Sequence, residues 1–134
     1  MPKVPLPLVL GRGLVARVAA DAHGSRAGAW AWCNSLGYAG RQGAAAERAV
    51  VPAGQLYHVP GGADPLAVVA MAHPAATAYL VTFGRLLPGE TVLVAGGGGN
   101  VGGALIELTA AAGARNLTTA AAADVGRCRG LGAA

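Results

Sequence analysis

Four consecutive glycines, Gly96–Gly99, lie between two apolar runs and constrain the fold of this chain more than any other feature. Glycine loses more conformational freedom on folding than any other residue, so four together need a structural reason. They could form a flexible linker, or a tight turn that lets the backbone approach a ligand closely. A linker should not be flanked by two well-patterned elements, and both neighbours are well patterned, which favours the turn.

The segments around the glycines predict a β-α-β unit. Thr91–Ala95 is a short β-rich run suited to a strand buried on both faces. Apolar residues then recur at helical spacing, and Gly113 stands where a helix C-terminus favours glycine. Arg115–Thr119 can form a second strand, and Asp124–Gly130 a short second helix. The residues at helical spacing are Val101, Leu105, Leu108 and Ala112.

Gly97, Gly99 and Gly102 satisfy the pattern G-x-G-x-x-G of dinucleotide-binding folds. The pattern alone is weak in a chain with 22 glycines, but here it follows a predicted strand and opens a predicted helix. Gly97 would allow the tight turn, Gly99 the approach to a pyrophosphate, and Gly102 the packing of helix on strand. The first helical N–H groups, near Asn100 and Val101, would face the phosphates.

The second part of the fingerprint is missing. NAD-binding versions place an acid at the end of the second strand to hold the ribose hydroxyls, and this chain has Ala120–Ala123 there. The nearest acid, Asp124, lies slightly beyond. An uncharged strand end with Arg127 and Arg129 downstream suits the 2′-phosphate of NADPH, unless both arginines are plain surface residues.

The first half of the chain predicts short strands separated by glycine-containing turns. The expected strands are Leu14–Ala19, Trp30–Cys33 and Ala46–Val51, and Pro52 would end the last of them. Residues 34–43 read as a loop.

Two helices are expected after the break at residues 59–65. Asp64 can cap the first, with Pro65 at its first position, and it continues over Leu66–Ala72. Pro74 should restart the helix, which then runs over Ala75–Leu86 with Ala76, Leu80 and Phe83 on one face.

Composition excludes several classes of protein. The 134 residues are 54% hydrophobic and 12% charged, which suits one foldable domain rather than disorder. The net charge of +4 comes from scattered arginines, so no nucleic-acid partner is expected. The apolar window of residues 65–83 is interrupted by His73 and Pro74 and reads as a buried helix rather than a membrane span. The start MPKVPLPLVLG has no signal-peptide core, so the cytoplasm is the default compartment.

No metal site is expected. Cys33, His58 and His73 are the upstream candidates for zinc, Cys128 is far away, and their spacing provides no four-ligand set. No catalytic nucleophile motif such as G-x-S-x-G is present, so the catalytic residues stay unknown.

The segment LLPGETVLVAGGGGNVGGALIELTAAAGA resembles the medium-chain dehydrogenase/reductase superfamily, and specifically its zinc-independent NADPH:quinone oxidoreductase branch. PAATAYLVTF is similar to the helix of that branch which enters the cofactor domain, and the resemblance extends over nearly the whole chain. It implies an α/β fold: a partial GroES-like β segment over residues 1–64, then linking helices and the first β-α-β unit of a Rossmann domain over residues 65–134.

The resemblance also implies hydride transfer from NADPH to a small molecule, a quinone or an activated alkene, and either a homodimer or a completing partner chain. Thr77 would lie near the nicotinamide, and Thr119 and Ala120 near the adenosine ribose. The implied pyrophosphate loop comprises Gly97, Gly99, Asn100, Val101 and Gly102. A non-catalytic remnant or interaction module of a dehydrogenase/reductase is the alternative.

Three departures from the family pattern stand out. Ala29 replaces an acid, and Asn116 stands where an apolar β-branched residue is usual. The chain also lacks the ends of the family's catalytic and cofactor domains, so we expect a truncated chain.

Overall fold

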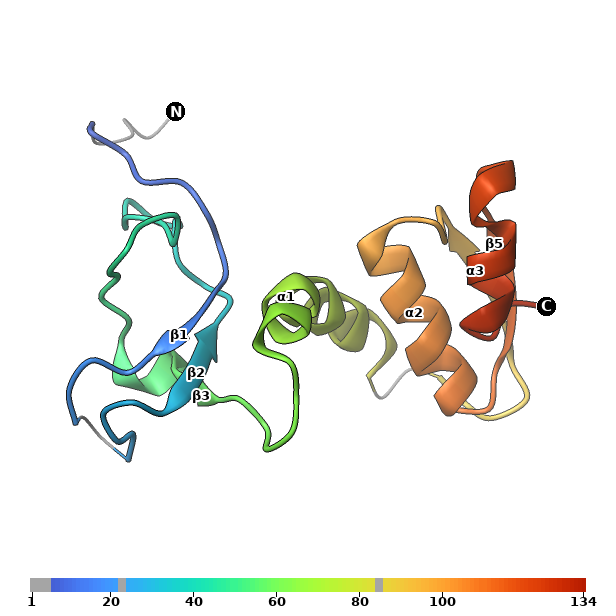
Figure 1. Cartoon of the computed structure of the whole chain (residues 1–134). Coiled ribbons are helices and arrows are strands. Elements are labelled where there is room, and N and C mark those ends of the chain that lie inside the picture. The colour runs from blue at the N-terminus through green and yellow to red at the C-terminus, as the bar shows by residue number, and fades with distance from the viewer. Residues whose placement is uncertain (1–5, 22–23, 84–85) are drawn as a thin grey trace. The chain divides into compact units, whose positions relative to one another are not determined.

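The computed structural model describes residues 6–21, 24–83 and 86–134. The chain divides into two compact units, Met1–His73 and Pro74–Ala134 (Figure 1). Their boundary falls inside helix α1, Pro65–Thr82. The division into domains at residues 64 and 65 stays a prediction.

The first unit contains a three-stranded antiparallel sheet in the order β1-β2-β3. Strand β1 is Leu14–Arg17, β2 is Trp30–Cys33 and β3 is Tyr57–His58, so the first two predicted strands are confirmed. Alternation along β2 buries Ala31 and Cys33 on one face and leaves the two tryptophans on the other. There the rings of Trp32 and Tyr57 stack, with centroids 4.8 Å apart.

The predicted strand Ala46–Val51 is wrong, because these residues form bends and coil and Val50 is 93% exposed. Residues 43–45, which directly precede this segment, are hydrogen-bonded to residues 9–11. The amides of residues 43, 44 and 45 donate to the carbonyls of Val9, Gly11 and Leu10, respectively, so this segment lies against the chain near its N-terminus. The place beside β2 goes to Tyr57–His58, which follows a 3₁₀ turn, η1 (Ala53–Gln55).

Helix α1 runs through Pro74 as one helix, so the predicted restart at this proline is wrong. The fixed φ of proline is helical, and its cost is the hydrogen bond to the carbonyl four residues earlier. That carbonyl belongs to Ala70, which is exposed, so water can satisfy it. The Asp64 cap is confirmed, because its Oδ1 accepts a 3.0 Å hydrogen bond from the amide of Leu66. Residues 84–85 of the predicted second helix lie outside the described residues.

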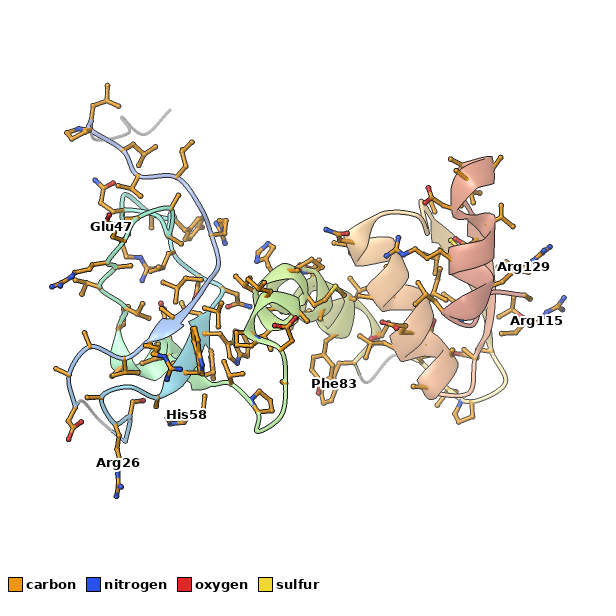
Figure 2. All side chains as sticks on the ribbon, viewed as in Figure 1. Arg26, Glu47, His58, Phe83, Arg115 and Arg129 are labelled. Carbon is orange, nitrogen blue, oxygen red and sulfur yellow. The ribbon has the colours of Figure 1, made fainter. Side chains whose placement is uncertain are left out.

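The expectation that α1 is a buried helix is also wrong. Ala78 is its buried residue, whereas Leu80 and Phe83, expected on one face, are 76% and 66% exposed. Figure 2 shows the side chain of Phe83 pointing away from the ribbon. The helix is apolar on every side, and much of that apolar surface is exposed. By length and composition α1 could cross a membrane, but single helices of soluble proteins pass the same test, so this does not assign it to one.

The second unit is the predicted β-α-β arrangement. Strands β4 (Thr91–Ala95) and β5 (Arg115–Thr119) pair in parallel, joined by helix α2 (Asn100–Ala111). A 3₁₀ turn, η2 (Ala122–Asp124), then leads into helix α3 (Val125–Gly130) (Figure 1). The carboxyl ends of both strands lie at the same edge of the sheet, since Ala95 pairs with Thr119.

The core of this unit is built on Val94, Ile106 and Cys128. Helix α2 buries a face offset by one residue from the predicted apolar spacing, and Val101 and Ala112 are exposed. Small residues make this offset possible, because they let the helix lie close to the strands. The buried residues of α2 are Gly102, Gly103, Ala104, Ile106 and Thr109.

Asn116, the polar departure in the second strand, is buried and fully bonded. Its Oδ1 accepts a short hydrogen bond from the hydroxyl of Thr109, and its Nδ2 donates to the carbonyls of Ile106 and Gly132 at 3.2 and 3.4 Å. Its backbone carbonyl accepts a 2.8 Å hydrogen bond from the amide of Ala134. One side chain thus connects β5 to α2 and to the turn after α3.

Asn116→Leu should lower the free energy of unfolding by about 1–3 kcal/mol, because it removes the buried hydrogen bonds that join β5 to Thr109, Ile106 and Gly132. The double variant Thr109→Val/Asn116→Leu should lose less than the sum of the two single variants, since both partners are then apolar. Urea unfolding followed by circular dichroism measures the three values. Additive losses would show that the pair is not coupled.

Candidate functional site

The loop Gly96–Gly99 connects β4 to α2 at the carboxyl edge of the sheet. Gly96 has φ +76°, a left-handed conformation that favours glycine. The amide of Gly99 closes the turn with a 3.1 Å hydrogen bond to the carbonyl of Gly96. The tight turn expected at Gly97 is therefore made by Gly96, and that part of the prediction is wrong by one residue.

Thr119, at the end of β5, holds the first half of the loop. Its backbone carbonyl accepts a 2.9 Å hydrogen bond from the amide of Gly97, and its Oγ1 accepts a 3.0 Å hydrogen bond from the amide of Gly96. The residue that the resemblance places near the ribose thus also anchors the turn, a role that its position in the sequence did not reveal.

Gly97 and Gly102 are buried and allow close packing. A Cβ on Gly97 would lie 2.8 Å from Cδ1 of Ile106 and 3.2 Å from Sγ of Cys128. A Cβ on Gly102 would lie 2.9 Å from the Cα of Gly97 and as close to the backbone of Gly96. Real Cβ atoms do not approach backbone this closely, so α2 can begin here only with glycine. The packing role expected of Gly102 is therefore present.

The outer face of the loop consists of Gly99, Asn100 and Val101, which are exposed. Gly99 is the N-cap of α2 in an extended conformation, with φ −80° and ψ 164°, and no side chain of the described residues caps this end. A Cβ on Gly99 would make an ordinary contact of 3.5 Å with the carbonyl oxygen of Gly96. The uncapped amides and the helix dipole make this end of α2 suited to an anion.

A hollow of about 420 Å³ lies beside the end of β5. It includes Thr119 and Ala120, the two residues expected near the ribose, together with the exposed Arg129 of α3. Figure 2 shows the side chain of Arg129 extending outward from α3. The lining residues are Thr118, Thr119, Ala120, Val125, Cys128, Arg129, Ala133 and Ala134.

Arg127 lies elsewhere. Its Nη1 donates a 2.7 Å hydrogen bond to the carbonyl of Gly98, so it contacts the glycine loop rather than the hollow. Asp124 also contacts the loop, since a Cβ on Gly98 would lie 2.8 Å from its Cγ. Sequence reasoning missed both contacts. The signal was the spacing of the two residues, three apart at the start of a predicted helix, which places them on one face.

The remaining predicted features are less closely tied to the loop. Thr77 is half-buried in α1, and its place beside a nicotinamide stays a prediction.

A larger hollow of about 570 Å³ in the first unit is lined mainly by apolar residues with Arg41, Gln42 and Arg48, and it holds no predicted site residue. Within residues 6–21, 24–83 and 86–134, no three His, Cys, Asp or Glu side chains are grouped as a metal ion would need.

Solved structures match this chain over almost all of its length. An alcohol dehydrogenase superfamily protein from Novosphingobium aromaticivorans is 34% identical, with a TM-score of 0.87 over 98% of this chain and 41% of its own. A mycobacterial protein complexed with NADPH is 27% identical, with a TM-score of 0.84 over 98% and 40%. An NAD-dependent alcohol dehydrogenase is 28% identical, with a TM-score of 0.90 over 99% and 47%.

These matches confirm the expected architecture, a partial GroES-like β segment followed by the start of a Rossmann domain. The chain spans less than half the length of each of these three structures. No protein-family model and no curated protein matches the chain.

Gly102→Ala should destabilise the second unit, because the new methyl group meets the backbone of Gly96 and Gly97. We expect a loss of about 1–3 kcal/mol from overpacking, larger than the helix-propensity gain of about 1 kcal/mol. Gly126→Ala in α3 is the matched control, since no atom in the described part of the chain lies within 4 Å of its added Cβ. The control should be neutral or slightly stabilising in urea unfolding, and equal effects of the two changes would contradict the packing role.

Proposed function

We propose that this chain, a member of the medium-chain dehydrogenase/reductase superfamily, binds NADPH through the loop Gly96–Gly99. The observation that carries the proposal is that the glycines of this segment differ in burial. Gly97 and Gly102 are buried and bring α2 onto the end of β4, whereas Gly99 and Asn100 are exposed at the uncapped start of the helix. Such an end accepts a pyrophosphate without any further side chain.

The residues on either side of this loop fit two parts of one dinucleotide, the pyrophosphate and the adenosine ribose. The pyrophosphate would take the amides near Asn100 and Val101, over the open face of Gly99. The adenosine ribose would lie by Thr119 and Ala120, in the hollow beside β5. The nicotinamide supplies the hydride when the cofactor is bound, and the protein's part is to hold and orient it. Thr77 is proposed to contribute to that end.

The preference for NADPH rests on this chain's own residues, because the similar structures include both an NADPH complex and an NAD-dependent enzyme. No acid stands at the end of β5, and Asp124 lies against Gly98 instead. Arg129 lines the hollow that holds Thr119 and Ala120, where a 2′-phosphate would be placed. A guanidinium group there favours the phosphate over a hydroxyl.

The acceptor that we propose is a small molecule of the quinone or activated-alkene class. This part rests on the sequence likeness of residues 86–114 to the zinc-independent quinone oxidoreductase branch. The similar structures include an alcohol dehydrogenase superfamily protein and an NAD-dependent alcohol dehydrogenase, which is consistent with a small-molecule substrate.

Gly99→Val should abolish cofactor binding while leaving the fold intact. The backbone angles of Gly99 suit any residue, and the side chain would enter the space proposed for the pyrophosphate. We expect at least about a 100-fold loss of NADPH affinity, the cost of losing roughly 3 kcal/mol of phosphate contacts. Fluorescence titration with NADPH measures it, and unchanged affinity would place the phosphates elsewhere. A parent chain that binds neither cofactor would instead favour a non-catalytic interaction module.

Arg129→Ala should weaken NADPH binding about 10-fold or more and leave NADH binding unchanged, because it removes a charged partner of the 2′-phosphate only. Parallel titrations with the two cofactors give the ratio. Tighter binding of NADH by the parent chain would refute the proposed preference, and a ratio unaffected by Arg129→Ala would remove this residue from it.

A further inference from the structure

The side chain of Arg127 lies across the glycine loop and the first turn of α2. Its Nη1 donates the 2.7 Å hydrogen bond to the carbonyl of Gly98. Its Nη2 lies 3.0 Å from the point where a Cβ on Gly103 would sit. Gly103 is buried, and the missing side chain there leaves room for the guanidinium group.

This contact completes the support of one peptide unit. A trans peptide is planar, and its C=O and N–H point in opposite directions. The unit between Gly98 and Gly99 has its C=O held by Arg127 and its N–H held by the carbonyl of Gly96. Its orientation is thereby fixed from both sides, directly before the uncapped amides of α2.

We propose that Arg127 is a positioning residue, which fixes the Gly98–Gly99 peptide so that the start of α2 is presented to the pyrophosphate. The effect of Arg127 on cofactor affinity rests on the proposed function. The hydrogen bond from Arg127 to Gly98 does not, because it is present in the chain without cofactor. A planar guanidinium suits this role because it donates along fixed directions and stays charged. Asp124, beside Gly98, flanks the same peptide from the end of η2.

This role differs from that of a 2′-phosphate ligand in a measurable way. A residue that positions the pyrophosphate loop acts on NADPH and NADH alike, because both contain the pyrophosphate. A residue that binds the 2′-phosphate acts on NADPH alone. Arg129, two residues further on and at the hollow, is the matched control within the same short helix.

The experiment compares the full chain with Arg127→Ala, Arg127→Lys and Arg129→Ala in two measurements. Hydrogen exchange in the free chain follows the amide of Gly99, with the core amide of Ile106 as the control for folding. Titrations with NADPH and with NADH then give two dissociation constants for each variant. Arg127 is exposed, so its replacement should leave the unit folded.

Arg127→Ala should speed exchange at Gly99 by about 5-fold or more and weaken both cofactors by about 5–10-fold, with their ratio unchanged. Arg127→Lys keeps the charge without the planar fork and should fall between the parent and Arg127→Ala. Arg129→Ala should leave the Gly99 amide unchanged.

Three results would overturn the inference: unchanged exchange at Gly99 in Arg127→Ala, loss of NADPH affinity alone, or full recovery by lysine, which would reduce the effect to charge. A parent chain that binds no cofactor would defeat the proposed function, and the exchange measurement would still decide whether Arg127 holds the loop.

Discussion

The close approach of α2 to the turn after β4 determines the rest of the second unit. At Gly102 the helix passes so near to the backbone of Gly96 and Gly97 that no side chain fits between them. Because the helix starts there, its first amides lie at the carboxyl edge of the parallel strands, and Ile106 and Thr109 reach the strands that they pack on. A larger residue at 102 would move the helix outward and open both the core and the loop.

Hydrogen bonds then stabilise the glycine loop and the packing of α2 on the strands. Thr119 supports the start of the loop from β5, Arg127 supports its middle from α3, and Asn116 joins β5 to α2 and to the last residues of the chain. These side chains come from β5 and α3 and contact the loop and α2, so the loop depends on the fold of the whole second unit. These hydrogen bonds let a chain with few large apolar residues keep a defined site, because they fix the orientation of the loop where a small apolar core provides little packing.

The sequence predicted the second unit better than the first, for physical reasons. Strand β4, the glycine turn, α2 and β5 follow one another within a short stretch, so local patterns report most of their contacts. Residues 46–51 have the composition of a strand, but strand pairing depends on segments distant in the sequence. Residues 43–45 are hydrogen-bonded to residues 9–11, and Tyr57–His58 pairs with β2 instead. Pro74 is a residue that usually ends a helix, but Ala70, whose carbonyl loses its hydrogen bond to residue 74, is an exposed residue.

Within the site, sequence reasoning found the backbone positions and missed the side chains that support them. The pattern of glycines located the turn, although the left-handed residue is Gly96 and not Gly97. The same reasoning treated Arg127 and Arg129 alike, and the structure separates them, one on the loop and one at the hollow. Their spacing places the two arginines on different faces of α3, but which face meets the loop depends on how α3 packs against α2, and that packing is not a local property.

Each unit contains one buried free thiol, Cys33 in the first and Cys128 in the second. A thiol reagent can reach either sulfur only when the surrounding structure opens, so the rate of labelling reports the free energy of that opening. Since Cys128 lies beneath Gly97 in the core of the β-α-β unit, its reactivity measures the second unit alone, and that of Cys33 measures the first. The chain therefore carries an internal pair of probes that can tell whether its two halves unfold together or one at a time.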